Sequence, residues 1–303
     1  MRRDTYISFQ ITERSLSKSR YYTTGFFAVY RGGHRKRFFM REIGSRDNRI
    51  YKEALKLSRK KYRDREGLYV VEGENLVREA LRYSCVDKIF VSSDRVNTYI
   101  EAGILDREPA DNVFSVEDSL FEKLAQTETS QGILATVRKK EFSVEELTEE
   151  KKGNNNFVVL DRLQDPGNIG TIVRTSEGAG YSGVIVLRGT ADVFSPKTVR
   201  AAAGSVFRNP IIHVEDNREL RKLCDRLGLK LVVTGFDTDK YYFDEDISRD
   251  TALVIGNEGN GVSDELMDMA DVKIKIPMMG ELESLNASVA AGILMYEVQR
   301  RGR

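Results

Sequence analysis

The chain has 303 residues, of which 40% are hydrophobic and 31% charged, and its mean hydropathy is −0.42. This composition is that of a soluble protein, and the length predicts two domains. No apolar run approaches the roughly 20 residues of a membrane-spanning helix, and the first residues lack the apolar segment of a secretory signal. The two cysteines, Cys85 and Cys224, lie far apart, which favours unpaired thiols in a reducing, cytoplasmic compartment.

Charge is unevenly distributed along the chain. Residues 1–65 contain 19 Lys or Arg and six Asp or Glu, a net charge of +13, whereas the whole chain carries +1. A basic N-terminal region attached to an acidic remainder suggests a polyanionic partner such as nucleic acid. A solvated tail and a charged helix face would explain the same charges, so charge alone leaves both interpretations open.

The first half of the chain is predicted to be an α/β domain after a basic extension. Residues 1–44 show no clear period and are expected to be flexible. A helix is predicted over 49–66, with Ile50, Ala54, Leu57 and Tyr62 near helical spacing and Gly67 ending it. Strand and helix patterns then alternate, which predicts an α/β domain over 45–142. Strands are predicted at 68–73, 86–93 and 132–140, and helices at 74–84. Residues 113–128 are predicted to hold the end of a strand followed by a helix capped by a serine.

A second α/β domain is predicted over 156–303. The charged stretch before it ends in three asparagines and predicts a linker over 143–155. Strands are predicted at 157–163, 183–187, 210–214, 230–236, 251–256 and 271–277. Helices are predicted between them at 170–178, 196–203, 218–227, 262–269 and 286–300.

The loop within "LDRLQDPGNIGTIVRTSEGAG" (160–180) is the first of three that suggest a binding site. A strand leads through a polar turn into a helix, and Asn168 and Arg174 lie close enough to serve one end of that helix. Ligands of open α/β sheets bind beyond the carboxyl ends of the strands. A plain connection, with Asn168 as helix cap and Arg174 on the surface, would explain the same residues.

A second glycine-rich loop, "LVIGNEGNGVSDEL" (253–266), follows a buried strand. Its glycines permit positive φ angles and close approach of a ligand to the backbone. The loop has neither a GK[ST] nor a GxGxxG pattern, so it does not predict a phosphate site. A tight turn before a helix capped at Ser263 or Asp264 is the alternative.

The third loop, in "IPMMGELESLNASVAAGILMYE" (276–297), precedes a helix with small side chains. Ser284 or Asn286 can cap this helix, and its first two turns contain Ala287, Ala290 and Ala291. Close packing against the sheet would explain the small residues but not the polar residues before them.

Metal and hydrolase sites are not predicted. His34 and His213 have no Cys or acid at ligand spacing, and no Gly-x-Ser-x-Gly pattern is present.

Taken in this order, the three loops resemble the SpoU/TrmH family of RNA ribose 2′-O-methyltransferases, within the SPOUT class. "NIGTIVRTSEGAG", "IGNEGNGVS" and "IPMMGELESLNASVAAGI" are similar to its three motifs, and "LYVVEGENLVREAL" is similar to its L30e-like substrate-binding domain. The resemblance implies an L30e-like α/β domain over 45–142. It also implies a trefoil-knotted methyltransferase domain with a mostly parallel sheet over 156–303, although knots are exceptional in proteins.

The family resemblance implies S-adenosylmethionine as the methyl donor and no metal. Carried over motif by motif, the implied catalytic residues are Asn168, Arg174, Glu258, Ser284 and Asn286. The implied donor-binding residues are Thr234, Gly235, Gly256, Asn257, Glu258, Ile276, Met278, Ser284, Leu285 and Asn286. The small side chains at the start of the helix predicted over 286–300 would then leave room for the donor.

The family's catalytic arginine corresponds to Arg174, for which two roles are open. A general base would require a neutral guanidinium, which is costly because its pKa lies above about 12. A charged Arg174 that binds the target phosphate with two hydrogen bonds is favoured.

The resemblance implies RNA as the partner, with ribosomal RNA favoured over transfer RNA, and a homodimer formed through the knotted domain. Two alternatives remain: a transfer RNA methyltransferase, and a non-catalytic RNA-binding or ribosome-assembly protein of the same fold.

Overall fold

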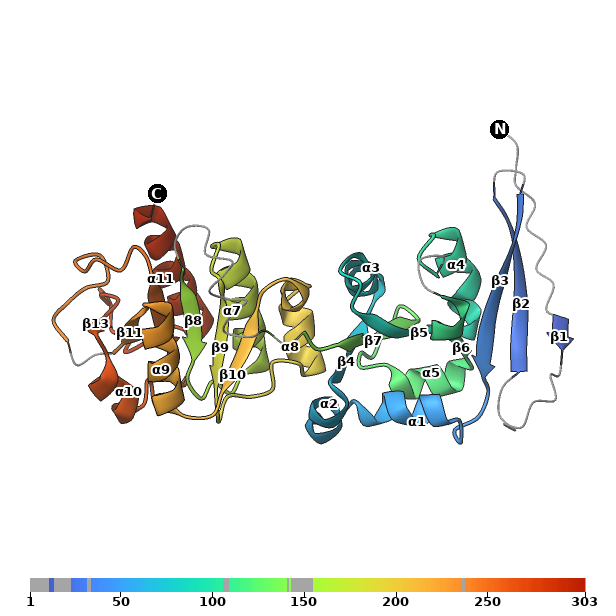
Figure 1. Ribbon diagram of the computed structural model, residues 1–303, viewed down its shortest axis with the longest axis horizontal. Helices are drawn as coiled ribbons and strands as arrows, with labels where there is room; N and C mark the ends of the chain where they lie inside the picture. The colour runs from blue at the N-terminus through green and yellow to red at the C-terminus, as the bar shows by residue number, and fades with distance from the viewer. Residues whose placement is uncertain are drawn as a thin grey trace. The chain divides into compact units, whose positions relative to one another are not determined.

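The structure is a computed structural model that describes residues 11–13, 23–31, 34–105, 109–140, 142, 155–235 and 238–302. The chain forms two compact units, Met1–Lys139 and Lys140–Arg303 (Figure 1). The predicted linker lies outside the described residues except for residue 155. Among the helices of the described ranges, none has the length and apolar character that crossing a bilayer requires.

The first unit is built on a mixed sheet. Its strand order is β1-β2-β3-β6-β5-β7-β4, with β3, β6 and β5 parallel and the remaining neighbours antiparallel. The strands are β1 (Ile11–Glu13), β2 (Thr23–Arg31), β3 (His34–Ile43), β4 (Leu68–Glu72), β5 (Val86–Ser92), β6 (Val113–Val116) and β7 (Ile133–Arg138).

Helices cover both faces of this sheet (Figure 1). On one face, buried side chains of α1 and α5, including Tyr51 and Phe121, pack with Phe90 and Phe114 from the strands. On the other face lie α3 and α4. The helices are α1 (Arg49–Lys56), α2 (Lys60–Glu66), α3 (Glu74–Arg82), α4 (Val96–Glu101) and α5 (Asp118–Leu124), with short 3-10 turns η1 (Ser93–Arg95) and η3 (Ala110–Asn112).

Two expectations for this unit differ from the structure. The sequence shows no period before residue 45, yet β2 and β3 lie there. The end of β3 pairs with β6, about 70 residues later in the chain, and such distant pairing leaves no local period. The single helix predicted over 49–66 is wrong, because it breaks into α1 and α2. Ser58 donates its hydroxyl proton to the Leu55 carbonyl, and the buried Arg63 donates to that of Leu57, so side chains replace helical hydrogen bonds.

The second unit contains a sheet in which every neighbouring pair is parallel. Its strand order is β10-β9-β8-β12-β11-β13. These are β8 (Phe157–Leu160), β9 (Gly183–Leu187), β10 (Ile211–Val214), β11 (Lys230–Thr234), β12 (Thr251–Ile255) and β13 (Val272–Ile274). Both faces of a parallel sheet are normally covered, and β8, β9 and β12 are accordingly buried throughout.

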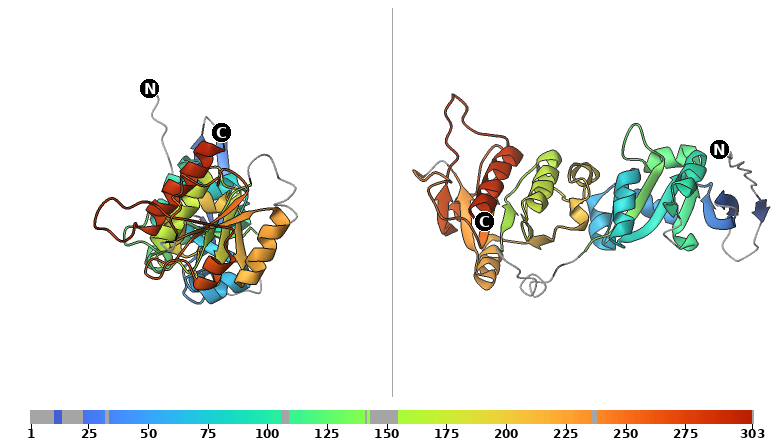
Figure 2. Two further views of the ribbon diagram at one scale, coloured as in Figure 1. Left: turned by 90° about the vertical axis from the view of Figure 1, so that its left-hand side faces the viewer. Right: turned by 90° about the horizontal axis from the view of Figure 1, so that it is seen from above.

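Helices lie on both faces of this second sheet. Figure 2 shows α7 and α11 side by side on one face and α9 on the other. On the α9 face, Leu220, Leu223 and Leu227 pack with strand residues such as Phe157 and Val159. The helices are α7 (Pro166–Gly178), α8 (Pro196–Ala201), α9 (Asn217–Leu227), α10 (Asp264–Met269) and α11 (Ala287–Arg301), with one 3-10 turn, η4 (Ser205–Phe207).

Strand order brings the three candidate loops to one edge of the sheet. β8 lies between β9, which follows it in the chain, and β12, which comes about 95 residues later. The order in which the chain adds strands across the sheet therefore reverses between β8 and β12. Open parallel sheets bind ligands at such a reversal of strand order. The loops after β8 and β12 meet there.

Candidate active site

Glu258 connects the glycine loop after β12 to the start of α7. Its carboxylate accepts hydrogen bonds from the backbone N–H groups of Gln164 and Asp165 and from the side-chain amide of Asn168, each at 3.1 Å. Burial acts to raise the pKa of Glu258, but the hydrogen bonds from Asn168 and from the two backbone groups outweigh it and lower that pKa. Glu258 is therefore held as a carboxylate that fixes the turn before α7.

Asn286 connects the same point to the last helix. Its Oδ1 accepts the N–H groups of Ser288 and Val289 at 3.0 and 3.3 Å, so it caps α11 as predicted. Its Nδ2 donates to Oδ1 of Asn168 at 2.9 Å. Asn168 is thus bound on one side by Glu258 and on the other by Asn286, and all three loops meet at its side chain.

The start of α7 is fixed by Asp165. Its carboxylate accepts the N–H of Asn168 at 2.8 Å, so Asp165 is the N-cap and the alternative of Asn168 as the cap is wrong. Pro166 takes the first helical position, which needs no donor. A Cβ at Gly170 would lie 2.5 Å from Cβ of Ala201, so this glycine lets α8 pack against α7.

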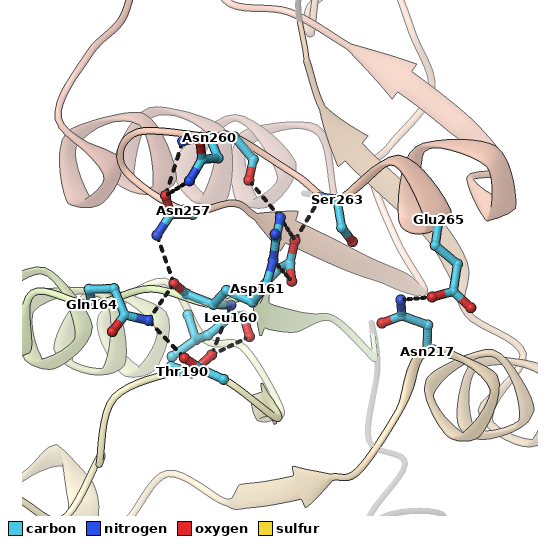
Figure 3. A network of polar contacts seen from close by, with 12 residues as sticks. Leu160, Asp161, Gln164, Thr190, Asn217, Asn257, Asn260, Ser263 and Glu265 are labelled. Carbon is cyan, nitrogen blue, oxygen red and sulfur yellow. Dashed lines mark hydrogen bonds and ion pairs between the residues drawn. The ribbon is translucent and has the colours of Figure 1, made fainter.

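A partly buried network that includes the buried Asp161 links the loops after β8 and β12 (Figure 3). Asp161 is 2% exposed, accepts the N–H of Ser263 at 2.8 Å, and pairs with Arg162 at 3.0 Å. Arg162 has a φ of 59°, which is unusual for a residue with a side chain. Asn257 Nδ2 donates to the Arg162 carbonyl at 2.9 Å. This hydrogen bond connects the turn at Arg162 to the glycine loop.

The glycine loop folds tightly on itself. A Cβ at Gly256 would lie 2.2 Å from N of Val262, and Asn257 and Gly261 exchange backbone hydrogen bonds at 2.9 Å. Gly261 has a φ of 67°. These glycines were expected to permit positive φ angles and close approach of a ligand to the backbone. At Gly256 the turn itself also requires the absence of a side chain.

A pocket of about 420 Å³ lies between the glycine loop, the end of β11 and the start of α11. Nine of the ten donor-binding residues expected from the sequence line it: Thr234, Gly235, Gly256, Asn257, Glu258, Ile276, Met278, Ser284 and Leu285. The tenth, Asn286, is outside the lining and contacts Asn168 instead. Ala287 and Ala290, in the first turn of α11, also line the pocket.

Arg174 lies on α7, six residues after Asn168. It is exposed and makes no ion pair or side-chain hydrogen bond with any residue in the described ranges. Ser284, the remaining predicted catalytic residue, is exposed at the pocket lining and has no side-chain hydrogen bond to the described residues. Hydrogen bonds therefore join Asn168, Glu258 and Asn286 but not Arg174 or Ser284.

Several site residues were not predicted. Gln164 and Asp165 bind Glu258 through their backbone N–H groups, and Lys275 and Glu283 line the pocket. The Asp-Pro-Gly sequence was a usable signal for Asp165, because an acid before proline commonly caps a helix. The backbone N–H of Gln164 could not be predicted as a donor, because almost every residue type has a backbone N–H.

The pocket can hold a small zwitterionic molecule with an apolar part. Ile255, Ile276 and Leu285 supply apolar walls, loop backbone supplies donors and acceptors, and Lys275 and Glu283 supply charges of both signs. The amino acid and adenine ends of S-adenosylmethionine match this set. No group of three His, Cys, Asp or Glu able to hold a metal occurs among the described residues.

Comparison with known proteins assigns the fold to a family. Residues 155–296 match the SpoU rRNA methylase family, and residues 48–135 match the MRM3-like substrate binding domain. The 23S rRNA (guanosine(2553)-2'-O)-methyltransferase RlmP of Bacillus subtilis is 35% identical over 265 residues, covering 86% of this chain and all of the relative. This chain belongs to the SpoU family of RNA methyltransferases.

Solved structures of SpoU-type enzymes support the same assignment. The AdoMet-bound rRNA methyltransferase of Sinorhizobium meliloti is 31% identical, with a TM-score of 0.74 over 86% of this chain and 97% of its own. The SpoU methyltransferase AviRb of Streptomyces viridochromogenes, in complex with the cofactor AdoMet, is 27% identical with a TM-score of 0.77, covering 84% and 98%. The predicted α/β class, with a substrate-binding domain before a mostly parallel sheet, is confirmed.

Proposed function

We propose that this SpoU family member transfers a methyl group from S-adenosylmethionine to a ribose 2′-hydroxyl of ribosomal RNA. The relative RlmP, which the chain matches along the relative's whole length, is named for this reaction on 23S rRNA. Two of the similar structures are described as AdoMet-bound. Ribosomal RNA is therefore favoured over transfer RNA.

The observation that carries the proposal is the junction at Asn168. Glu258 and Asn286 hold this side chain at the end of the sheet, and Glu258 also lines the 420 Å³ pocket. The junction thus places side chains from three loops beside the pocket, where a donor and an acceptor could be held together. Preorganisation of this kind can contribute as much as about 7–11 kcal/mol to a reaction between two held partners.

The pocket residues hold the donor in this proposal. S-adenosylmethionine, when bound, supplies a methyl group activated by the neighbouring sulfonium. The apolar walls at Ile276 and Leu285 take the adenine ring, while Lys275 and Glu283 pair with the carboxylate and the ammonium. Ala287 and Ala290 leave room beside the helix.

Arg174 holds the acceptor RNA. An exposed guanidinium without an ion-pair partner among the described residues can give two parallel hydrogen bonds to a phosphate and thereby orient the neighbouring ribose. The ribose 2′-oxygen would bond to the methyl carbon, the carbon–sulfur bond of the donor would break to leave a neutral thioether, and the hydroxyl proton would pass to water. Ser284, exposed at the pocket lining, can donate a hydrogen bond to either substrate.

The remaining sequence predictions stay part of this proposal: the trefoil knot in residues 156–303, the domain limits, the cytoplasmic location and the homodimer. Val289, Ile293 and Tyr296 form an exposed apolar stripe on α11, with exposures of 51%, 37% and 54%, which favours contact with a second copy. Sedimentation velocity should give the mass of two chains for the wild type and of one chain for Ile293→Glu. A single-chain mass for the wild type would exclude the homodimer.

Methyl transfer to RNA from cells lacking the protein tests the function. Total RNA is incubated with the purified chain and labelled S-adenosylmethionine, and 2′-O-methylated positions are mapped with and without the protein. We expect one new site in ribosomal RNA. A new site in transfer RNA would correct the substrate, and absence of incorporation into any RNA would favour the non-catalytic alternative.

A further inference from the structure

The break between α1 and α2 carries a cluster of unpaired positive charge. Residues 46–66 contain nine Lys or Arg and four Asp or Glu. Four exposed side chains, Arg46, Lys56, Arg59 and Lys61, make no ion pair or side-chain hydrogen bond with residues of the described ranges. Other cations of this segment are paired, such as Lys52 with Asp47 at 2.7 Å. The unpaired cations are therefore available to a polyanion.

A pocket of about 290 Å³ opens beside one of these cations, Lys56, between α1, α2 and the sheet. Leu57, Tyr62, Leu68 and Phe90 give it an apolar and aromatic wall, and Lys56 lies at its lining. Arg65 and Lys56 lie 4.9 and 5.7 Å from the centre of the Tyr62 ring. The pocket thus combines an aromatic ring with cations.

Each acid that lines this pocket is neutralised within the unit. Glu53 pairs with Arg49 at 2.8 Å, and Glu66 pairs with Arg65 at 2.5 Å. Asp87 pairs with both Lys88 and Arg138, at 2.6 and 2.7 Å. These ion pairs remove the negative charge that would repel a phosphate, whereas Lys56 has no carboxylate partner among the described residues.

We propose that this surface, the α1–α2 corner, binds the substrate RNA, with an unpaired base in the pocket and backbone phosphates on Lys56, Arg59 and Lys61. Proteins that read RNA commonly place unpaired bases against aromatic rings and arginine planes. Lys56 lies beside such a ring, and Arg59 and Lys61 lie at the start of α2, the helix that carries Tyr62. Phosphates flanking an inserted base would therefore lie near these cations. This inference rests on the proposed function and assigns its substrate contact to a particular surface.

The first test removes the three charges together. The variant Lys56→Gln/Arg59→Gln/Lys61→Gln is compared with Lys123→Gln/Arg218→Gln/Lys222→Gln, which removes three exposed and unpaired charges from α5 and α9. Binding of a labelled single-stranded RNA of about 16 nucleotides is measured by fluorescence anisotropy at several salt concentrations. The slope of log affinity against log salt should fall in magnitude by about 2, at roughly 0.7 for each lost phosphate contact.

The control variant should keep the wild-type slope. Equal slopes in the two triple variants would overturn the proposal. Methyl transfer in the same proteins separates this inference from the proposed function: the α1–α2 variant should raise KM for RNA at unchanged kcat. A wild type that transfers no methyl group would refute the function, while the slopes would still decide the surface.

The second test addresses the base pocket. Wild-type protein should bind the RNA probe more tightly than a probe of equal length that lacks its bases, by about fivefold or more for one stacked base. Tyr62→Leu should remove this preference and Tyr62→Phe should retain it, because only the second keeps a ring. A preference that survives Tyr62→Leu would exclude the pocket as a base site.

Discussion

The side-chain amide of Asn286 donates to Oδ1 of Asn168 at 2.9 Å, across 118 positions of the chain. The direction of this bond is determined by its neighbours. The Glu258 carboxylate can only accept, so Asn168 must turn its Nδ2 toward it, and Oδ1 is left for Asn286. Asn286 in turn uses Oδ1 for the N–H groups of α11. Donors and acceptors therefore run in one direction from the last helix to the glycine loop.

Changing Asn286 to Asp should separate helix capping from the bond to Asn168. Aspartate is as good a cap as asparagine but cannot donate to Asn168, so stability should change little while methyl transfer falls about tenfold or more. Asn286→Ala removes both and should lose about 1 kcal/mol of unfolding free energy as well. Urea unfolding and methyl transfer assays measure the two effects. Wild-type activity in the Asp variant would show that the bond is dispensable.

Glu258→Gln should weaken the same junction from the other end. A glutamine has only one acceptor oxygen in place of the two carboxylate oxygens. At least one of the three donors would therefore face the glutamine NH2 group or remain unpaired. We expect a loss of about 1 kcal/mol in unfolding free energy, kept small by exposure of the carboxylate to water, and a clear loss of methyl transfer. Glu281→Gln, an exposed acid without a partner among the described residues, is the control and should change neither.

Acid should reduce the stability difference between wild type and Glu258→Gln. The pKa of Glu258 is lowered in the folded protein, so its stabilising contribution is present above the ordinary glutamate pKa of about 4.3 and is lost as pH falls through the lowered value. Unfolding free energies of the two proteins should converge in acid. A difference that stays constant over that range would contradict this account.

Arg174 should be needed for RNA methylation and not for folding. Because it is exposed and unpaired within the described residues, Arg174→Lys and Arg174→Ala should change unfolding free energy by less than about 0.5 kcal/mol. Both should lose methyl transfer by about tenfold or more, since lysine cannot give the paired hydrogen bonds. Arg218→Lys on α9 is the control. Substantial activity of Arg174→Lys that rises with pH would instead indicate a general base.

Filling the pocket from the helix side should block the donor. Ala290→Leu places three additional carbons in the pocket lining, and S-adenosylmethionine affinity measured by calorimetry should fall by about tenfold or more. Val289→Leu adds one carbon at a site on the same helix that is 51% exposed, and it should leave affinity unchanged. Equal affinities for Ala290→Leu and wild type would place the donor elsewhere. Gly256→Val is unsuitable, because it would disrupt the loop.

The sequence predicted much of the second unit because its strands are short apolar runs between turn residues. Asn286 as a cap was predicted from these patterns, and nine of the residues that line the pocket were predicted from the family resemblance. The break at Leu57 was missed, because Ser58 and Arg63 replace helical hydrogen bonds with side-chain bonds that periodicity does not register. The role of Gln164 was missed because it acts through its backbone, and that of Asp161 because its burial depends on strands far apart in the chain.

The junction at Asn168 also sets an order of events during synthesis. Asn168 and the α7 turn leave the ribosome well before Glu258, and Asn286 and Ala290 come later still. A nascent chain that already contains β8 and α7 consequently lacks the walls of the pocket that we propose for the donor. On that proposal, a chain released by premature termination before residue 286 would transfer no methyl group.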